Sequence, residues 1–250
     1  MPVKKSAAPP APRRASKPAA KSAGTKTKVP AKPAEHTEPA RPYHHGNLRD
    51  ALLQAAETVL QRDGLPGLTL RAIARETGVS HTAPKHHFGD TAGLLSDLAA
   101  SGHWRLGMEI AAQARLLPSG RARRRAVAQG YVHFAAREPE LFRLMGRIEL
   151  LDPARPTLAQ GMRASARALM GIFDEPLGEQ ANPYAGISTD QAVTITAAWG
   201  FVHGLSMLLV DQQLGRIAQS AGFRQPVELV EAVLNRMELA VTDGMREVRA

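Results

Sequence analysis

Apolar residues recur every three or four positions after the first 46 residues of the chain, which is the spacing of one face of an α-helix. These positions are Leu48, Leu52, Ala55, Ala56, Val59 and Leu60. Asn47 is placed to cap the start of this helix, and the turn-forming pairs Asp63-Gly64 and Pro66-Gly67 mark its end. The pattern therefore predicts a first helix of about four turns.

Two shorter helices are predicted next. The first runs from about Thr69 to Thr77, with Thr69 as its N-cap and Gly78 as its stop. The second reaches about His87 and carries Pro84 near its first turn, where a missing N–H costs least. The segments that separate and close these helices are Gly78-Val79-Ser80 and Phe88-Gly89-Asp90.

The rest of the chain keeps the helical pattern. Pro, Gly and Ser interrupt it at residues 118–120, 138–139, 152–156, 176–188 and 222–226. These breaks delimit about six further helices. No segment shows sustained alternation of apolar and polar residues, and aromatic residues make up only 4% of the chain. The fold class predicted is all-α, with a three-helix unit followed by about six helices.

Residues 1–42 differ from the rest in composition. They hold nine of the 18 prolines and ten alanines but no Phe, Trp or Tyr, so we expect a disordered tail. Ten basic and two acidic side chains give this tail a charge of +8, out of +9 for the whole protein. The tail is either a solubilising extension or an arm that raises non-specific DNA affinity by releasing counterions.

The absence of Cys excludes disulfides, thiolate metal sites and cysteine nucleophiles, and it fits a reducing compartment. The N-terminus lacks the apolar run of a signal peptide. The longest apolar stretch, Ala197 to Val210, is interrupted by His203 and is shorter than the roughly 18 to 20 residues of a membrane span. We therefore expect a cytoplasmic protein without a membrane partner.

Two short helices joined by a Gly-containing turn and preceded by a longer helix form the pattern of a helix-turn-helix unit at residues 47–88. In such a unit two helices brace the third, which enters the major groove of DNA. We expect Ile73, Val79 and Phe88 to pack in its core. The candidate contacts to bases or phosphates are Thr69, Arg71, Ser80, His81, Thr82, Ala83, Lys85, His86 and His87.

Three segments of the sequence resemble the tetracycline-repressor (TetR) family. Leu68 to Ser80, LTLRAIARETGVS, together with His87-Phe88-Gly89-Asp90 and Leu94-Leu95, resembles the DNA-binding domain of that family. Residues 42–49, PYHHGNLR, resemble the entry to the first helix in one of its branches. Residues 198–205, AWGFVHGL, resemble the Trp-His-Gly (WHG) C-terminal domain of the same branch. The resemblance covers about residues 42–248.

The resemblance implies an all-helical homodimer that binds operator DNA, in most relatives as a repressor. A small effector bound in the C-terminal domain changes the separation of the two recognition helices, which enter major grooves about 34 Å apart. After the tail at 1–42 that composition predicts, the resemblance implies a DNA-binding domain at 43–90 and an effector-binding and dimerisation domain at 91–250.

The sequence departs from the family pattern at two positions. Lys85 stands where relatives usually have Tyr, and Thr91 stands where they usually have Lys, so one phosphate contact is exchanged for another. Residues 43–95 contain five basic and five acidic side chains and thus carry no net charge. Because neutral histidines add little charge at pH 7, we favour the basic tail as the source of electrostatic attraction to DNA.

Residues 188–215 are predicted as one long helix in which Gly200 and Gly204 let a neighbouring helix approach closely, and a second long helix runs from about Pro226 to Val248. The apolar stripe of the second helix either closes a four-helix dimer interface or packs internally; it comprises Val227, Val230, Val233, Leu234, Met237 and Val241. The candidate effector contacts, each equally suited to core packing, are His133, Phe134, Phe142, Met145, Trp199, His203 and Met207.

The sequence contains no P-loop or dinucleotide-binding glycine loop, no His-Glu-x-x-His and no Gly-x-Ser-x-Gly, so we predict neither an enzyme nor a cofactor. The pairs His44-His45 and His86-His87 diverge by about 100° on a helix, which does not make a metal site. The leading hypothesis is a sequence-specific repressor released by a small effector, although an activator uses the same DNA-binding unit. The alternatives are a nucleoid-like, non-specific DNA-binding protein dominated by the tail, and a ligand-binding or catalytic helical protein that does not bind DNA.

Overall fold

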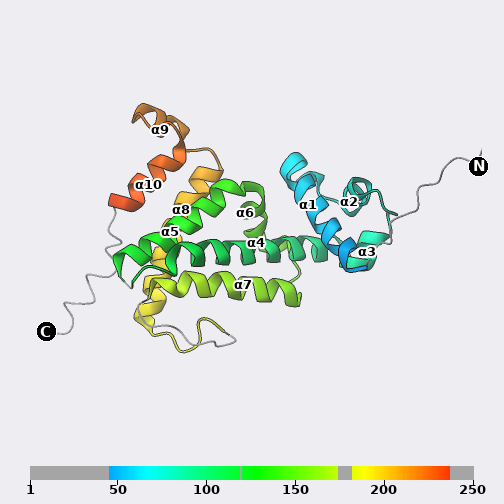
Figure 1. The fold of residues 1–250 in the computed structure, drawn as a ribbon, viewed down its shortest axis with the longest axis horizontal. Coiled ribbons are helices and arrows are strands. Elements are labelled where there is room, and N and C mark those ends of the chain that lie inside the picture. Colours follow the sequence, from blue (N-terminus) through cyan, green and yellow to red (C-terminus); the bar gives the residue numbers. More distant parts are fainter. Residues whose placement is uncertain (1–44, 119, 174–181, 237–250) are drawn as a thin grey trace, which may run out of the picture. The chain divides into compact units, whose positions relative to one another are not determined.

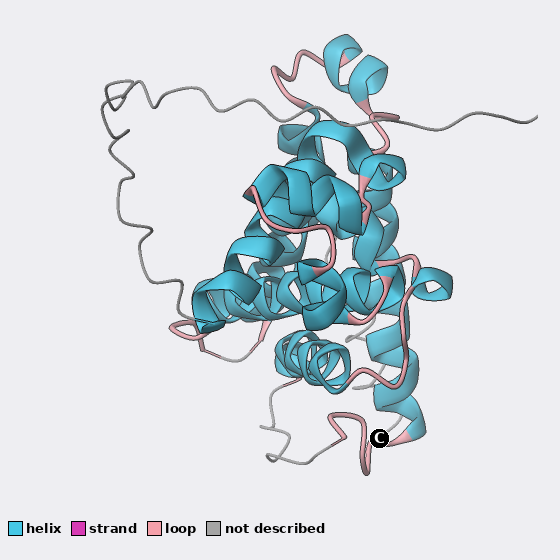
Figure 2. Ribbon diagram, turned by 90° about the vertical axis from the view of Figure 1, so that its right-hand side faces the viewer, coloured by secondary structure: helices cyan, strands magenta, loops and turns pink. Residues whose placement is uncertain are grey.

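A computed structural model describes residues 45–118, 120–173 and 182–236, which contain helices and no strand (Figures 1 and 2). The all-α prediction is confirmed. The α-helices are α1 (His45–Gly67), α2 (Leu70–Thr77), α3 (Ala83–Phe88), α4 (Thr91–Ala114), α5 (Arg121–Arg137), α6 (Pro139–Met145), α7 (Pro156–Leu169), α8 (Thr189–Val210), α9 (Gly215–Ser220) and α10 (Pro226–Arg236). Two 3₁₀ turns, η1 (Ile148–Leu150) and η2 (Met170–Ile172), flank α7.

Local sequence signals determine where α2 begins and ends and where α3 begins. The Thr69 hydroxyl accepts a hydrogen bond of 3.1 Å from the Ala72 N–H and so caps α2, as predicted. Gly78 ends α2 in the left-handed conformation, with φ of 68°. Pro84 lies in the first turn of α3. The three predicted helices are therefore confirmed.

The start of α1 differs from the prediction. The helix begins at His45, so Asn47 lies inside its first turn and is not its N-cap. At the other end, the helical geometry breaks at Gly64, whose φ is 68° and ψ is −176°, and one more helical turn follows to Gly67. The predicted break at Asp63-Gly64 is thus correct, because glycine tolerates a backbone conformation that other residues disfavour.

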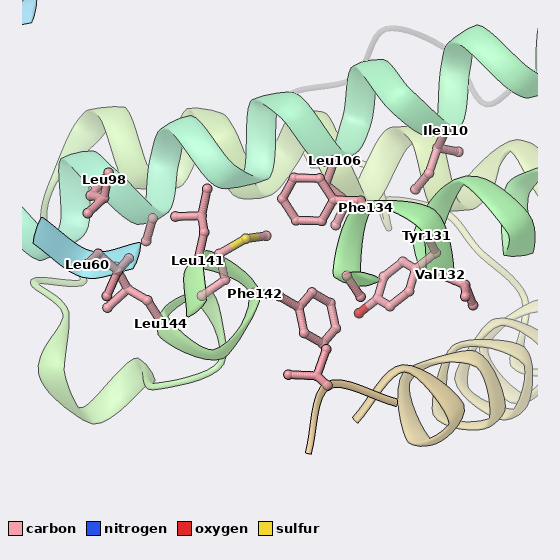
Figure 3. Close-up of a cluster of buried hydrophobic side chains, with 14 of the residues drawn as sticks. Leu60, Leu98, Leu106, Ile110, Tyr131, Val132, Phe134, Leu141, Phe142 and Leu144 are labelled. Carbon is pink, nitrogen blue, oxygen red and sulfur yellow. The ribbon is translucent and has the colours of Figure 1, made fainter. Parts of the chain in front are cut away.

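Helix α4 is the centre of the fold and lies between α5 and α7 (Figure 1). Its contact with α7 is close at Gly161, where a Cβ would lie 2.7 Å from the Ala100 carbonyl oxygen. The buried core around α4 includes Leu98, Leu106 and Ile110 (Figure 3). It is continuous with the α1–α3 unit through residues such as Leu60, so the three-helix unit rests on the N-terminal half of α4.

The five predicted breaks separate helices, but the region after residue 90 contains seven described α-helices instead of about six. The long helix predicted over 188–215 is present as α8 but ends at Val210, five residues earlier than predicted, and Gln212 adopts a φ of 58° before α9 begins at Gly215. No atom of another described element lies within 4 Å of the Cβ positions at Gly200 and Gly204, so the close helix approach expected there is absent within the described chain.

Helix α10 is described from Pro226 to Arg236, and the remainder of the helix predicted to Val248 lies outside the described residues. Val230 and Leu234 are 0% and 7% exposed and pack in the core. The internal-packing alternative therefore holds for these two positions. Val227 and Val233 are half-buried, and the last two members of the apolar stripe, Met237 and Val241, lie outside the described residues.

Helix α8 is long and apolar enough, by length and composition alone, to cross a membrane, although the sequence pattern predicted no such segment. Only 28% of the most apolar 18-residue stretch of α8 is buried by the described part of the chain. Core helices of soluble proteins meet the same criterion, so this single helix is weak evidence for a membrane span. Its low burial shows that one face of α8 has no cover from the described part of the chain.

Burial lowers the pKa of the His103 imidazole from 6.5 to about 4, while its Nδ1 lies 2.9 Å from Ser165 Oγ on α7. The unfolded chain therefore binds this proton more readily, so stability is complete above about pH 6.5 and falls as the pH drops toward 4. We expect this group to remove about 2 kcal/mol of unfolding free energy between about pH 7 and about pH 4.5. Urea denaturation of the protein and of His103→Gln at both pH values tests this, and an equal pH dependence of the two would contradict it.

Candidate nucleic-acid interface and ligand cavity

The helix-turn-helix unit is braced by buried apolar side chains and by an ion pair. Ile73 and Phe88 are 0% and 1% exposed, and Val79 packs half-buried against the same core, as predicted. Arg62 of α1 donates to Glu76 of α2 over 3.0 Å. This pair joins the two bracing helices.

The residues predicted to contact DNA lie on the surface of this unit. Seven are exposed and two, Ala83 and His87, are half-buried; the exposed ones are Thr69, Arg71, Ser80, His81, Thr82, Lys85 and His86. Helix α3 begins only at Ala83, so Ser80 to Thr82 belong to the turn that leads into it. The Ser80 and Thr82 hydroxyl oxygens lie 2.9 Å apart and order that turn. DNA contact by these nine residues remains a prediction.

The charge on α3 suits a polyanion. Its last turn carries Lys85, His86 and His87, and the helix contains no acidic residue. The nearest carboxylate along the chain, Asp90, is occupied as the N-cap of α4, where it accepts a hydrogen bond of 2.8 Å from the Gly93 N–H. The exposed surface of α3 can therefore bind phosphate groups or base edges, because no acidic side chain of the same helix repels the phosphates or pairs with the basic residues.

A small apolar cavity of about 20 Å³ lies between α5, α8 and the end of α7. Its walls are formed by Arg124, Val127, Ala128, Tyr131, Leu169, Ile172, Ile195, Ala198, Trp199 and Val202. This volume accommodates about one water molecule. A larger ligand therefore has to displace the side chains of the wall.

Three polar side chains converge beside this cavity. The Tyr131 hydroxyl lies 2.9 Å from His203 Nδ1 and accepts a hydrogen bond of 3.3 Å from Trp199 Nε1. Burial raises the pKa of Tyr131 to about 12 and lowers the pKa of His203 below its ordinary value, so both are neutral near pH 7. The ring of Phe142 lies 5.5 Å from that of His203 and completes the cluster. Figure 3 shows Tyr131 and Phe142 side by side.

The other candidate effector residues lie in different surroundings. His133 bridges α4 and α10, because its Nδ1 lies 3.2 Å from Gln113 Nε2 and its Nε2 lies 2.8 Å from Glu231. Phe134 and Met145 are buried in the core, and Met207 packs half-buried against it. Of the predicted set, the structure thus brings together Phe142, Trp199 and His203, with Trp199 in the cavity wall. Whether any of these seven residues binds an effector remains a prediction.

Sequence patterns did not point to Tyr131, whose hydroxyl joins Trp199 to His203, or to the aliphatic wall at Leu169 and Ile172. The signal available for Tyr131 was a single phenol among apolar residues of a helix, since a buried hydroxyl needs a partner. Among the described residues no group of three metal-ligating side chains gathers at one place.

The uncovered face of α8 carries small and apolar side chains. We call it the α8 face; it consists of Val193, Thr196, Ala197, Gly200, Gly204 and Leu208, all exposed. Apart from the adjacent pair Thr196 and Ala197, these residues follow one another at intervals of three and four, so they lie on one side of the helix. Val193 and Leu208 are 62% and 38% exposed, whereas Ala198 and Val202 on the opposite side are buried.

Comparison with known proteins places these features in a family. Residues 52–98 match the family described as bacterial regulatory proteins, tetR family, and residues 124–244 match the Tetracyclin repressor-like, C-terminal domain. A protein of unknown function from Rhodococcus sp. RHA1 is 34% identical, with 78% of this chain and 96% of that one covered and a TM-score of 0.60. No curated protein matches the sequence.

A bacterial regulatory protein in the tetR family from Rhodococcus RHA1 has the same fold at 19% identity, with 77% of this chain and 94% of that one covered and a TM-score of 0.54. The two family matches cover the helix-turn-helix unit and most of the helices that follow it. Assignment to the WHG branch stays a prediction. The chain belongs to the TetR family of bacterial DNA-binding transcriptional regulators.

Proposed function

We propose that this regulator is a homodimeric, sequence-specific repressor that a small-molecule effector releases from its operator. The observation that carries the proposal is the helix-turn-helix unit. Its core is buried, while the side chains of its turn and of α3, other than those of Pro84 and Phe88, are exposed or half-buried. In this proposal residues 43–90 bind DNA, residues 91–250 dimerise and bind the effector, and the protein acts in the cytoplasm without a membrane partner.

The α8 face supports dimerisation. An operator with two-fold symmetry requires two recognition helices, and a second copy of the chain supplies the second one. The α8 face is apolar, exposed and free of charged side chains, which is the composition of a surface that another protein covers. In a dimer, Gly200 and Gly204 would let the two copies of α8 approach each other closely.

The cavity supports the effector role of the C-terminal helices. Its wall is apolar and the Tyr131, Trp199 and His203 cluster supplies a few polar atoms at one side, which is the usual composition of a small-molecule site. The small volume favours a ligand that opens the site as it binds. Such an opening shifts helices, which is what release from DNA requires.

The experiment that tests the proposal selects DNA from a random pool with the full-length protein and footprints the selected sequence at near-physiological salt. The same footprint is made with residues 43–250 alone and with a scrambled DNA of equal length. A short protected site with two-fold symmetry, retained by the shorter protein, supports the repressor. We expect removal of residues 1–42 to weaken binding to both DNAs by a similar factor.

The second candidate function, a non-specific DNA-binding protein, is favoured by the +8 charge of residues 1–42. It predicts uniform protection that is lost together with those residues, and a much smaller salt dependence without them. That result would overturn sequence-specific repression. Retention of the DNA preference by residues 43–250 would instead overturn the second candidate.

Lys85→Ala is expected to lower operator affinity by roughly tenfold, because Lys85 is an exposed basic side chain in the last turn of α3. Fluorescence anisotropy at several salt concentrations measures this. A salt slope reduced by about one unit identifies a phosphate contact, whereas lost discrimination at one base pair identifies a base contact. Arg163→Ala on α7 is the matched control. If Lys85→Ala binds the operator as tightly as the unaltered protein does, Lys85 does not contact DNA.

A further inference from the structure

Asp97 of α4 is a buried carboxylate that binds side chains from α1 and from the start of α7. Its side chain is 1% exposed and accepts two hydrogen bonds from Arg155, at 3.1 Å from Nε and 2.6 Å from Nη2. Arg49 of α1 reaches it at 2.9 Å, and the Thr157 hydroxyl donates to it as well. Burial alone would raise the pKa of Asp97, but these hydrogen bonds and charges outweigh burial and hold that pKa below its ordinary value.

Arg155 also holds the end of the recognition helix. Its Nη1 donates over 3.1 Å to the carbonyl oxygen of Phe88, the last residue of α3. Carbonyls at a helix end lack partners within the helix, so a guanidinium satisfies an acceptor there and suits the negative end of the backbone dipole. Arg49 lies over the Phe88 ring, 5.8 Å from its centroid. Both arginines thus contact Asp97 and Phe88 at once.

Gly93 shows how closely this junction is packed. A Cβ at position 93 would lie 2.1 Å from the Phe88 carbonyl oxygen and 2.8 Å from Arg155 Nη1. The end of α3 therefore rests directly on the first turn of α4, and no side chain fits between them. Because the packing leaves no free space at this junction, a movement of Arg155 or of α4 also moves the end of α3.

Helix α7 leads from this junction toward the cavity. Arg155 immediately precedes α7, and Leu169 at its other end, with Ile172 in the turn that follows, forms part of the cavity wall. A helix of 14 residues is about 21 Å long. Because α7 also packs tightly on α4 at Gly161, the helix is a stiff connection between the two places.

We propose that Asp97 and Arg155 are positioning residues that set the orientation of α3 toward DNA, and that α7 links them to the state of the cavity. This inference deepens the proposed function and rests on it. A ligand that displaces Leu169 and Ile172 moves α7, Arg155 follows, and the carbonyl end of α3 loses its anchor. Neither residue touches DNA, so both act through α3.

Hydrogen exchange of the full-length protein tests the positioning role without DNA. In Arg155→Gln we expect the amides of residues 83–93 to exchange roughly tenfold faster than in the unaltered protein, while those of α5 and α8 keep their rates. Arg163→Gln is the matched control, since it removes an arginine from α7 for which the described residues show no ion pair. Unchanged exchange at residues 83–93, or equal acceleration throughout the core, overturns the proposal.

DNA binding separates positioning from a merely structural role. On the sequence that the unaltered protein selects, we expect Arg155→Gln to bind at least tenfold more weakly, with less than about threefold change on scrambled DNA. Equal losses on both DNAs overturn the proposal. Failure of the unaltered protein to select any sequence would sink the repressor function, while the exchange experiment would still decide whether Arg155 positions α3.

A double-mutant cycle tests the link through α7. Ala128→Leu overfills the cavity and presses on the wall opposite α5, so it stands in for a bound ligand. We expect Ala128→Leu alone to weaken binding to the selected DNA by roughly fivefold. In a protein that already carries Arg155→Gln, we expect Ala128→Leu to cause no further loss of affinity. If the effects of the two substitutions on affinity are additive, or if Ala128→Leu alone has no effect, the proposed link through α7 is overturned. Ala198→Leu on α8 replaces Ala128→Leu if the latter does not fold.

Discussion

Gly204→Glu is expected to leave the protein folded but monomeric, and to lower its affinity for a two-fold-symmetric operator by at least about 10³. Among the described residues, nothing outside the backbone of α8 and the residues next to Gly204 lies within 4 Å of a Cβ at this position, so the substitution has space there. In the proposed dimer the same side chain places a charge in the middle of the α8 face, where burial without a partner is costly. One recognition helix alone then contacts a single half-site.

Analytical ultracentrifugation at micromolar concentration measures the assembly, fluorescence anisotropy measures the affinity, and circular dichroism verifies the helix content. Gln219→Glu adds the same charge to an exposed position of α9, away from the α8 face, and should change neither assembly nor affinity. A Gly204→Glu protein that remains dimeric would show that the interface lies elsewhere on the molecule.

Phe88→Ala is expected to lower the free energy of unfolding by about 3 to 5 kcal/mol. The ring is 1% exposed and packs at the meeting point of α1, α3 and α4, so its removal leaves a cavity that the short α3 cannot fill. The ring also lies beneath the guanidinium of Arg49, and that contact is lost with it. The expected loss is a large part of the stability of an ordinary domain.

Urea denaturation followed by circular dichroism measures the loss, and Phe88→Leu should recover most of it by restoring apolar volume. Tyr184→Ala removes a ring that is 46% exposed and should cost less than about 1 kcal/mol. A loss for Phe88→Ala no larger than that of the exposed control would mean that α3 does not depend on the core beneath it.

The helix-turn-helix unit was predictable because its boundaries depend on short-range chemistry. Thr69 accepts a hydrogen bond from an N–H three residues later, Gly78 takes a left-handed conformation, and Pro84 suits a first turn. None of these requires knowledge of the rest of the chain. The apolar positions Ile73 and Phe88 followed from helical periodicity, and both are buried. The resemblance of this unit to the TetR DNA-binding domain is confirmed by the family match over residues 52–98.

The roles of polar residues in the C-terminal helices were not predictable in the same way. His133 and His203 both interrupt apolar runs, yet His133 pairs with Glu231 on α10, whereas His203 lies beside Tyr131 and Phe142. Gly200 and Gly204 were expected to admit a neighbouring helix, but among the described residues close helix contacts are made at other glycines, such as Gly130 and Gly161. Sequence spacing places residues on a helix face and leaves open which element that face meets.

Residues distant in sequence form the junction at Asp97. Arg49, Phe88, Asp97 and Arg155 come from four helices or their ends and meet only because α1, α4 and α7 pack together. Helix caps, turns and apolar periodicity are local properties, so the amino-acid sequence was sufficient to determine the fold class and the DNA-binding unit. Pairings across helices depend on packing distances and burial, so the anchor of α3, the cavity wall and the uncovered α8 face became visible only in three dimensions.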